Sequence, residues 1–81
     1  MKKQYEVALM FRVGKLEDND FITDEFCDAD NYRDAVRIAK DYSMKCDACD
    51  VICYCKTAET DYCQIFRETY IKGKKLRRIE F

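Results

Sequence analysis

The sequence contains no histidine, no proline and no tryptophan, and it has only two glycines among its 81 residues. Without histidine there can be no Ser-His-Asp triad, no Cys-His pair and no zinc ion held by imidazole. The glycines, Gly14 and Gly73, stand far from each other and from any Lys-Ser/Thr pair, so the sequence has no glycine-rich phosphate loop. These absences exclude several large classes of enzyme.

Long hydrophobic runs are also missing. The apolar run at residues 7–11 is preceded by Glu6 and followed by Arg12, and it is too short for a signal peptide or a membrane span. We therefore expect one cytoplasmic domain over residues 1–81, with no membrane partner. In a reducing compartment free thiols are the default, so the six cysteines are not expected to form a disulfide framework.

Catalysis is poorly supported by chain length. Aspartate, glutamate, lysine, cysteine and tyrosine are all present, but a chain of 81 residues encloses little pocket volume. Active sites usually occupy concave cavities of about 300 Å³ or more. We therefore expect a protein that is not an enzyme, with no catalytic residues and no cofactor.

Alternating apolar residues predict the first strands. Every second residue from Tyr5 to Val13 is apolar, which is typical of a half-buried strand. Residues 21–27 form a second extended run that contains two adjacent acids, and an edge position in a hairpin suits such a strand. We therefore expect the chain to begin with a hairpin whose second strand lies at the edge of a sheet.

A helix is predicted over about residues 31–45. Asn31, with Asp34 three residues later, approximates a capping box, and the following apolar residues recur at helical spacing on one face. After it, residues 51–56 and 62–71 alternate as a further hairpin in which both faces are apolar, so the pattern leaves the buried face open. A last run ending at Phe81 predicts a fifth strand.

Together these elements predict an α+β fold. A single helix packs on one face of a four- to five-stranded, mainly antiparallel sheet in the order β-β-α-β-β, followed by the fifth strand. The register of the 51–71 hairpin stays open. A five-residue loop would place Cys55 opposite Cys63, and a loop one residue shorter would place Gln64 there.

Four cysteines lie close together as a C-x2-C followed by a C-x-C, at Cys46, Cys49, Cys53 and Cys55. Four thiolates bind zinc tetrahedrally, so a metal site is one interpretation. In a strand, however, Cys53 and Cys55 would have α-carbons about 6.6 Å apart and parallel side chains, which separates their sulfurs. We therefore favour cysteines that pack as small apolar core residues, with zinc as the alternative cofactor.

Charge is strongly divided along the chain despite a net charge of −1. Residues 17–34 carry eight acids and one base, whereas residues 72–78 carry five bases and no acid. Such blocks bear on partners more than on fold. The candidate acidic patch comprises Glu17, Asp18, Asp20, Asp24 and Glu25.

We expect a small intracellular binding or regulatory module that acts through protein-protein contacts, by self-association as a homodimer or as an inhibitor or adaptor. The alternatives are a zinc-stabilised module with four cysteine ligands, nucleic-acid binding by the basic segment, and mimicry of nucleic acid by the acidic stretch. The candidate interaction residues are aromatic or basic: Tyr54, Phe66, Tyr70, Lys72, Lys74, Lys75, Arg77 and Arg78.

Overall fold

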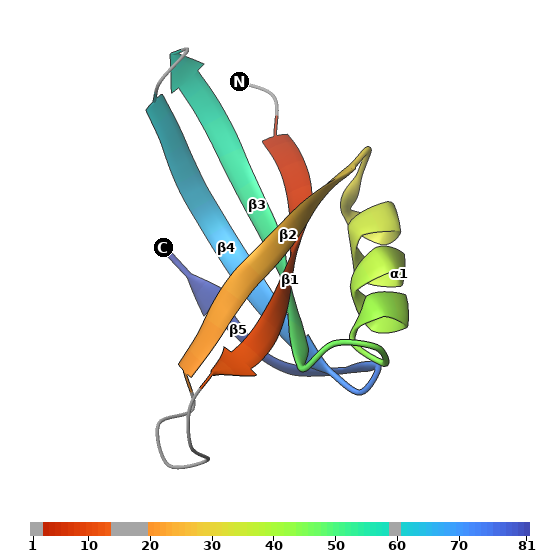
Figure 1. Cartoon of the computed structure of the whole chain (residues 1–81). Helices are drawn as coiled ribbons and strands as arrows, with labels where there is room; N and C mark the ends of the chain where they lie inside the picture. The colour runs from red at the N-terminus through yellow and green to blue at the C-terminus, as the bar shows by residue number, and fades with distance from the viewer. Residues whose placement is uncertain (1–2, 14–19, 59–60) are drawn as a thin grey trace.

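The computed structural model describes residues 3–13, 20–58 and 61–81, with the backbone alone at 12–13, 20–22, 24 and 57–58. Within these ranges, one helix and five strands follow one another as β1 (Lys3–Val13), β2 (Asp20–Ala29), α1 (Tyr32–Tyr42), β3 (Ala48–Ala58), β4 (Asp61–Ile71) and β5 (Lys74–Glu80). The strands form an antiparallel sheet in the order β2-β1-β3-β4-β5, and α1 packs on one side of it (Figure 1). This confirms the predicted α+β class, the single helix and the fifth strand.

The predicted edge strand is also confirmed, because β2 lies at one end of the sheet and β5 at the other. The connection through α1 carries the chain across β1. As a result, β3 pairs with the edge of β1 that faces away from β2. None of the described helical residues form a segment with the length and apolar character needed to cross a membrane.

The helix is shorter than expected at its C-terminal end. Its N-cap is Asn31, whose side chain accepts a hydrogen bond from the Asp34 amide at 2.9 Å, as the capping pattern predicts. At the other end Ser43 caps the helix, and the next residues turn back with the Lys45 and Cys46 amides both donating to the Tyr42 carbonyl oxygen. This early turn lets β3 begin at Ala48 instead of near residue 51.

The main core lies between α1 and the sheet. Ala35 and Ala39 are fully buried on the inner face of α1, and their small size allows the helix to approach the strands closely. Odd-numbered residues of β1 and β3 face the helix as cross-strand pairs, such as Val7 with Val51. This resolves the side of β3 that the sequence left open. The cluster comprises Val7, Leu9, Ala35, Ala39, Cys49, Val51, Cys53, Phe66 and Tyr70.

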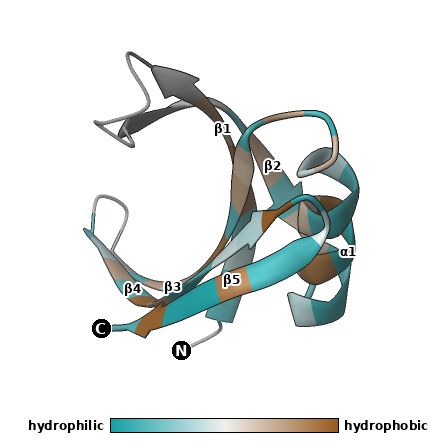
Figure 2. Cartoon of the chain, turned by 90° about the horizontal axis from the view of Figure 1, so that it is seen from below, coloured by the Kyte–Doolittle hydropathy of each residue, from teal (hydrophilic) through white to brown (hydrophobic). Residues whose placement is uncertain are grey.

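A second, smaller cluster lies on the side of the sheet away from α1. It consists of Ala8, Met10, Ala48 and Ile52, and no helix covers it in the described part of the chain. The sheet is strongly curved, and this face lies on the inside of the curve (Figure 2). Register shifts in three of the four strand pairs accompany this curvature, since bulges increase local twist.

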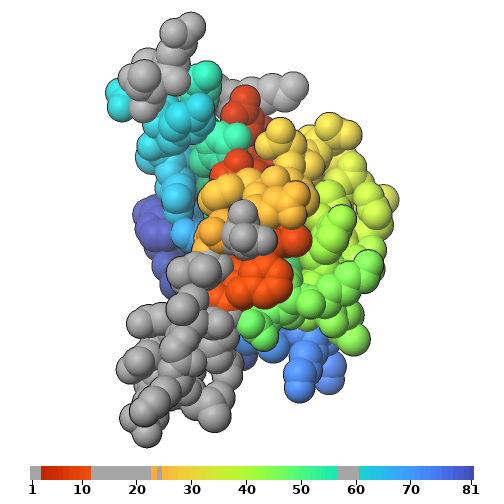
Figure 3. All heavy atoms as spheres, viewed as in Figure 1, coloured from red at the N-terminus to blue at the C-terminus, as the bar shows by residue number. Residues whose placement is uncertain are grey.

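The turn between β4 and β5 is fastened to the end of α1. Lys72 and Gly73 both have positive φ angles, of 51° and 78°, which suits a two-residue hairpin loop. The Gly73 amide donates to Ser43 Oγ at 2.8 Å, and Ser43 Oγ donates to the Lys40 carbonyl oxygen at 3.0 Å. In the space-filling view this turn lies directly against the C-terminal end of the helix (Figure 3).

We expect Ser43→Ala to lower the free energy of unfolding by about 1–2 kcal/mol, because the Gly73 amide loses its acceptor and the buried site cannot replace it. Urea denaturation measures the change. Thr23→Ala, at an exposed position of β2, is the matched control and should stay within about 0.5 kcal/mol of the parent chain. Equal effects of the two substitutions would contradict the role assigned to Ser43.

Candidate functional site

The four clustered cysteines are distributed along β3 and the turn before it. Cys49 and Cys53 are fully buried in the main core, which agrees with the packing interpretation. The Cys46 and Cys49 sulfurs lie 3.3 Å apart. The pKa of the Cys49 thiol is raised mainly by burial and, as the second cause, by the hydrogen bond with Cys46. Within the described ranges no three cysteine, aspartate or glutamate side chains group to hold a metal ion. The zinc-stabilised module stays a prediction, which metal analysis of protein prepared without chelator tests.

The register of the β3–β4 hairpin places Cys55 opposite Cys63. Of the two registers that the sequence left open, this is the one predicted for a five-residue loop. The strands nevertheless continue further toward the loop than expected, with Ala58 paired to Asp61. Cys55 is half-buried, Cys63 is exposed, and both are free thiols.

The aromatic residues proposed as contacts do not share one surface. Phe66 and Tyr70 keep only 6% and 2% of their surface exposed, so they lie mainly in the core, and their part in a contact surface stays a prediction. They point toward α1, where Phe66 packs with the rings of Tyr5 and Tyr32. Tyr54 lies on the opposite side of the sheet beside Tyr62.

The acidic patch falls partly outside the described residues. Glu17 and Asp18 lie there, and Asp20 and Asp24 belong to β2 with only their backbone described. Glu25 is exposed on β2 and pairs in register with Leu9. Within β2 itself there are four acids and no base.

Glu68 is the most deeply buried charged residue in the described part of the chain, with no exposed surface. The hydroxyls of Tyr32 and Tyr70 donate to its Oε1 at 2.7 and 3.2 Å, and Arg78 and Lys75 approach its Oε2 at 3.2 and 3.5 Å. Four partners therefore offset the cost of removing this carboxylate from water. They come from α1, β4 and β5, so Glu68 joins three elements.

The surroundings of Glu68 move the pKa of each of its two phenol partners further above neutral pH. Burial, and then the hydrogen bond and charge of Glu68, raise the pKa of Tyr32. Burial and the charge of Glu68 likewise raise the pKa of Tyr70. Both hydroxyls therefore remain hydrogen-bond donors, and a phenolate next to Glu68 is strongly disfavoured.

A cationic groove lies above this cluster, between α1 and the start of β5. It encloses about 580 Å³. Four of its lining residues are cations and none is an acid. We use the name cationic groove for the residues Tyr32, Arg33, Val36, Lys40, Tyr70, Gly73, Lys74 and Lys75.

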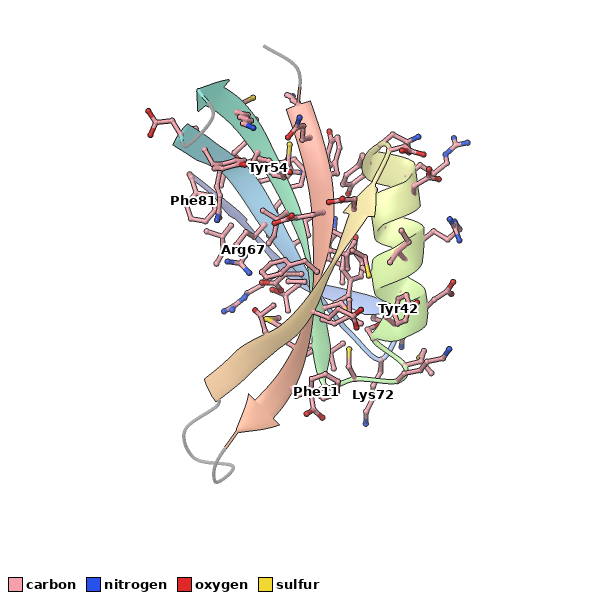
Figure 4. All side chains as sticks on the ribbon, turned by 45° about the horizontal axis from the view of Figure 1, so that its top comes forward. Phe11, Tyr42, Tyr54, Arg67, Lys72 and Phe81 are labelled. Carbon is pink, nitrogen blue, oxygen red and sulfur yellow. The ribbon has the colours of Figure 1, made fainter. Side chains whose placement is uncertain are left out.

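The basic segment of residues 72–78 is thereby divided into residues with different surroundings. Lys74 and Lys75 enter the cationic groove, whereas Lys72 sits in the exposed turn, near the same end of the molecule as Tyr42 (Figure 4). Arg78 pairs with Glu68 and Glu80, and its guanidinium lies 4.0 Å from the centre of the Phe66 ring. Arg77 is exposed on β5.

Neither the role of Glu68 nor the contact of the helix with the basic segment was predicted from the sequence. A signal for Glu68 was present, because a two-residue loop at Lys72-Gly73 brings residue 68 opposite residue 78 once one bulge is allowed. Arg33 and Lys40 are exposed on α1, but their approach to Lys74 depends on how the hairpin docks against the helix. The local sequence pattern does not indicate how the hairpin docks.

The side of the sheet away from α1 carries a second missed ion pair. Arg67 contacts Asp50 at 2.8 Å, and Figure 4 shows Arg67 pointing away from the helix. Asp50 Oδ1 and Arg67 Nε are buried and have no hydrogen-bond partner among the described residues. Nearby on this face, burial raises the pKa of Glu6, with Asp28 as the next cause.

Comparison with known proteins gives no relatives: no protein-family model, no curated protein and no solved structure matches this chain.

Alkylation of the folded protein tests the placement of the cysteines. Iodoacetamide should modify Cys63 first because it is exposed, whereas Cys49 and Cys53 should react only after unfolding. Mass spectrometry of timed samples identifies the order, and in urea without reductant all six thiols should react. A uniform rate in the folded protein, or fewer than six modified thiols in urea, would contradict this placement.

Proposed function

We propose that this chain is a non-enzymatic binding module that acts through protein-protein contacts made by its sheet edges. The single observation that carries the proposal is that β5, an outer strand, has three large exposed apolar residues in or beside it. Leu76, Ile79 and Phe81 have 63%, 43% and 69% of their surface exposed. An exposed apolar edge strand favours pairing with an added strand.

The charge of β5 indicates which partner strand it would take. Besides its apolar residues β5 contains four bases and one acid. Strand addition places side chains of the partner directly across the edge, where like charges oppose pairing and opposite charges favour it. The proposed partner is therefore an acidic extended segment.

The chain itself contains such a segment in β2, the other edge strand, which has four acids and no base. Joining β5 of one copy to β2 of the next would continue the sheet from molecule to molecule. This contact is head-to-tail, because each copy contributes a different surface. Self-association by complementary edges is thus the form of binding that we propose, in the cytoplasm, where the free cysteines would remain reduced.

Two variants that each disable one edge test the proposal. L76E/R77E should remove the basic character of β5 and one of its apolar residues, and E25K/D28K should cancel the negative charge of β2, because two of its four acids become bases. The parent chain should form dimers and larger species at low salt, with less association at high salt. Each variant alone should be monomeric by light scattering during size-exclusion chromatography.

The mixture of the two variants distinguishes pairing of complementary edges from other forms of association. Each retains the edge that the other lacks, so an equimolar mixture should form dimers and stop there. T69S/R37Q, which changes neither edge, serves as the control and should associate like the parent chain. A parent chain that stays monomeric at high protein concentration, or a mixture that stays monomeric, would contradict self-association through these edges.

A further inference from the structure

We infer that the cationic groove is a binding site for a small ligand that carries two or more phosphoryl groups. This inference does not depend on the sheet edges and stands separately from the proposed function. It rests on the convergence of four cations, on the lack of opposing charge among them, and on the size of the groove.

The four cations come from three places in the chain. Arg33 lies in the first turn of α1, Lys40 in its last turn, and Lys74 and Lys75 at the start of β5. The hydrogen bonds from Gly73 through Ser43 to Lys40 hold the hairpin against the helix, so the two sides of the groove keep a fixed spacing. Such preorganisation reduces the entropy that a ligand would lose on binding.

These cations have little internal compensation. Among the described residues Arg33, Lys40 and Lys74 form no ion pair, and Lys75 reaches only Glu68, at 3.5 Å. Glu68 is fully buried and is also held by two tyrosines and Arg78, so it is not available to neutralise the rest of the groove. Like charges held together at a surface raise the free energy of the empty site, and an anion lowers it.

The amount of charge favours phosphoryl groups over a single carboxylate. Four cations against one buried carboxylate leave a net charge of +3. One phosphoryl group carries about −1.5 to −2 at neutral pH and offers three acceptor oxygens. Two such groups would match the groove in charge and would supply acceptors for lysine and arginine donors on both sides.

The dimensions favour a small molecule over a polymer. The groove volume of about 580 Å³ lies within the usual range of small-ligand sites, and its walls include Tyr32, Val36 and Tyr70 for the apolar part of a ligand. A nucleic-acid surface would need a longer basic track, but Arg78 is paired with two acids and the chain has a net charge of −1.

The test is a titration of the full chain with inorganic pyrophosphate. Binding is measured by isothermal titration calorimetry and by changes in amide chemical shifts in NMR spectra. Shifts should centre on Arg33, Lys40 and residues 73–75, and pyrophosphate should bind more tightly than inorganic phosphate. The variants K74Q and R33Q should each weaken binding about tenfold, the effect of losing one charge-assisted hydrogen bond.

R37Q and K72Q are the matched controls, since each removes an exposed cation near the groove that does not line it. They should leave pyrophosphate affinity within about twofold of the parent chain. All four positions are exposed, and thermal denaturation should confirm that the variants fold. The inference is overturned if millimolar pyrophosphate shifts no groove amide, or if the controls weaken binding as much as K74Q. Binding of a single-stranded oligonucleotide without any response to pyrophosphate would overturn it as well.

Discussion

The arrangement of this protein depends on a carboxylate that has been taken completely out of water. Glu68 is buried where α1, β4 and β5 meet, and it is stabilised there by two tyrosine hydroxyls, a lysine and an arginine. Removing a charge from water costs several kcal/mol, and these partners together offset that cost. The carboxylate thereby requires the helix and the last hairpin to adopt one particular arrangement.

This requirement explains how a solvated basic segment becomes an organised surface. Lys75 and Arg78 are drawn toward Glu68, which turns their side of β5 toward the helix. The hydrogen bonds of Ser43 hold the turn at the other end of the groove. Lys74 is then brought near Arg33 and Lys40, although nothing in its immediate sequence specifies that approach. We expect this buried ion cluster to contribute more to the choice of one arrangement than to net stability, because apolar replacements of buried ion pairs are often equally stable.

Local patterns predicted the elements well and their packing only in part. The alternation from Tyr5 to Val13 and the cap at Asn31 identify a strand and a helix start directly, since both depend on neighbours in sequence. The buried side of β3 could not be predicted because both of its faces contain apolar residues, and the curved sheet buries Ile52 as well as Val51. The burial of Phe66 and Tyr70 could not be predicted for the same reason: an aromatic residue on a two-sided strand gives no sign of which side the helix covers.

The site was less predictable than the fold, because its charges come from segments distant in sequence. Tyr32 and Glu68 are 36 positions apart in the sequence. Only the docking of α1 on the sheet brings the Tyr32 hydroxyl to 2.7 Å from Glu68 Oε1. The basic run of residues 72–78 was visible, but the division between groove, turn and ion cluster follows from one bulge and one two-residue loop. Small irregularities in β5 thus decide which of its cations face α1.

A double-mutant cycle measures whether Glu68 couples the helix to the last hairpin. Tyr32→Phe and Glu68→Met, alone and together, are compared by urea denaturation with the parent chain. We expect a coupling energy of about 1.5–3 kcal/mol, the range of a hydrogen bond to a charged group. Additive effects, with a coupling below about 0.3 kcal/mol, would contradict it.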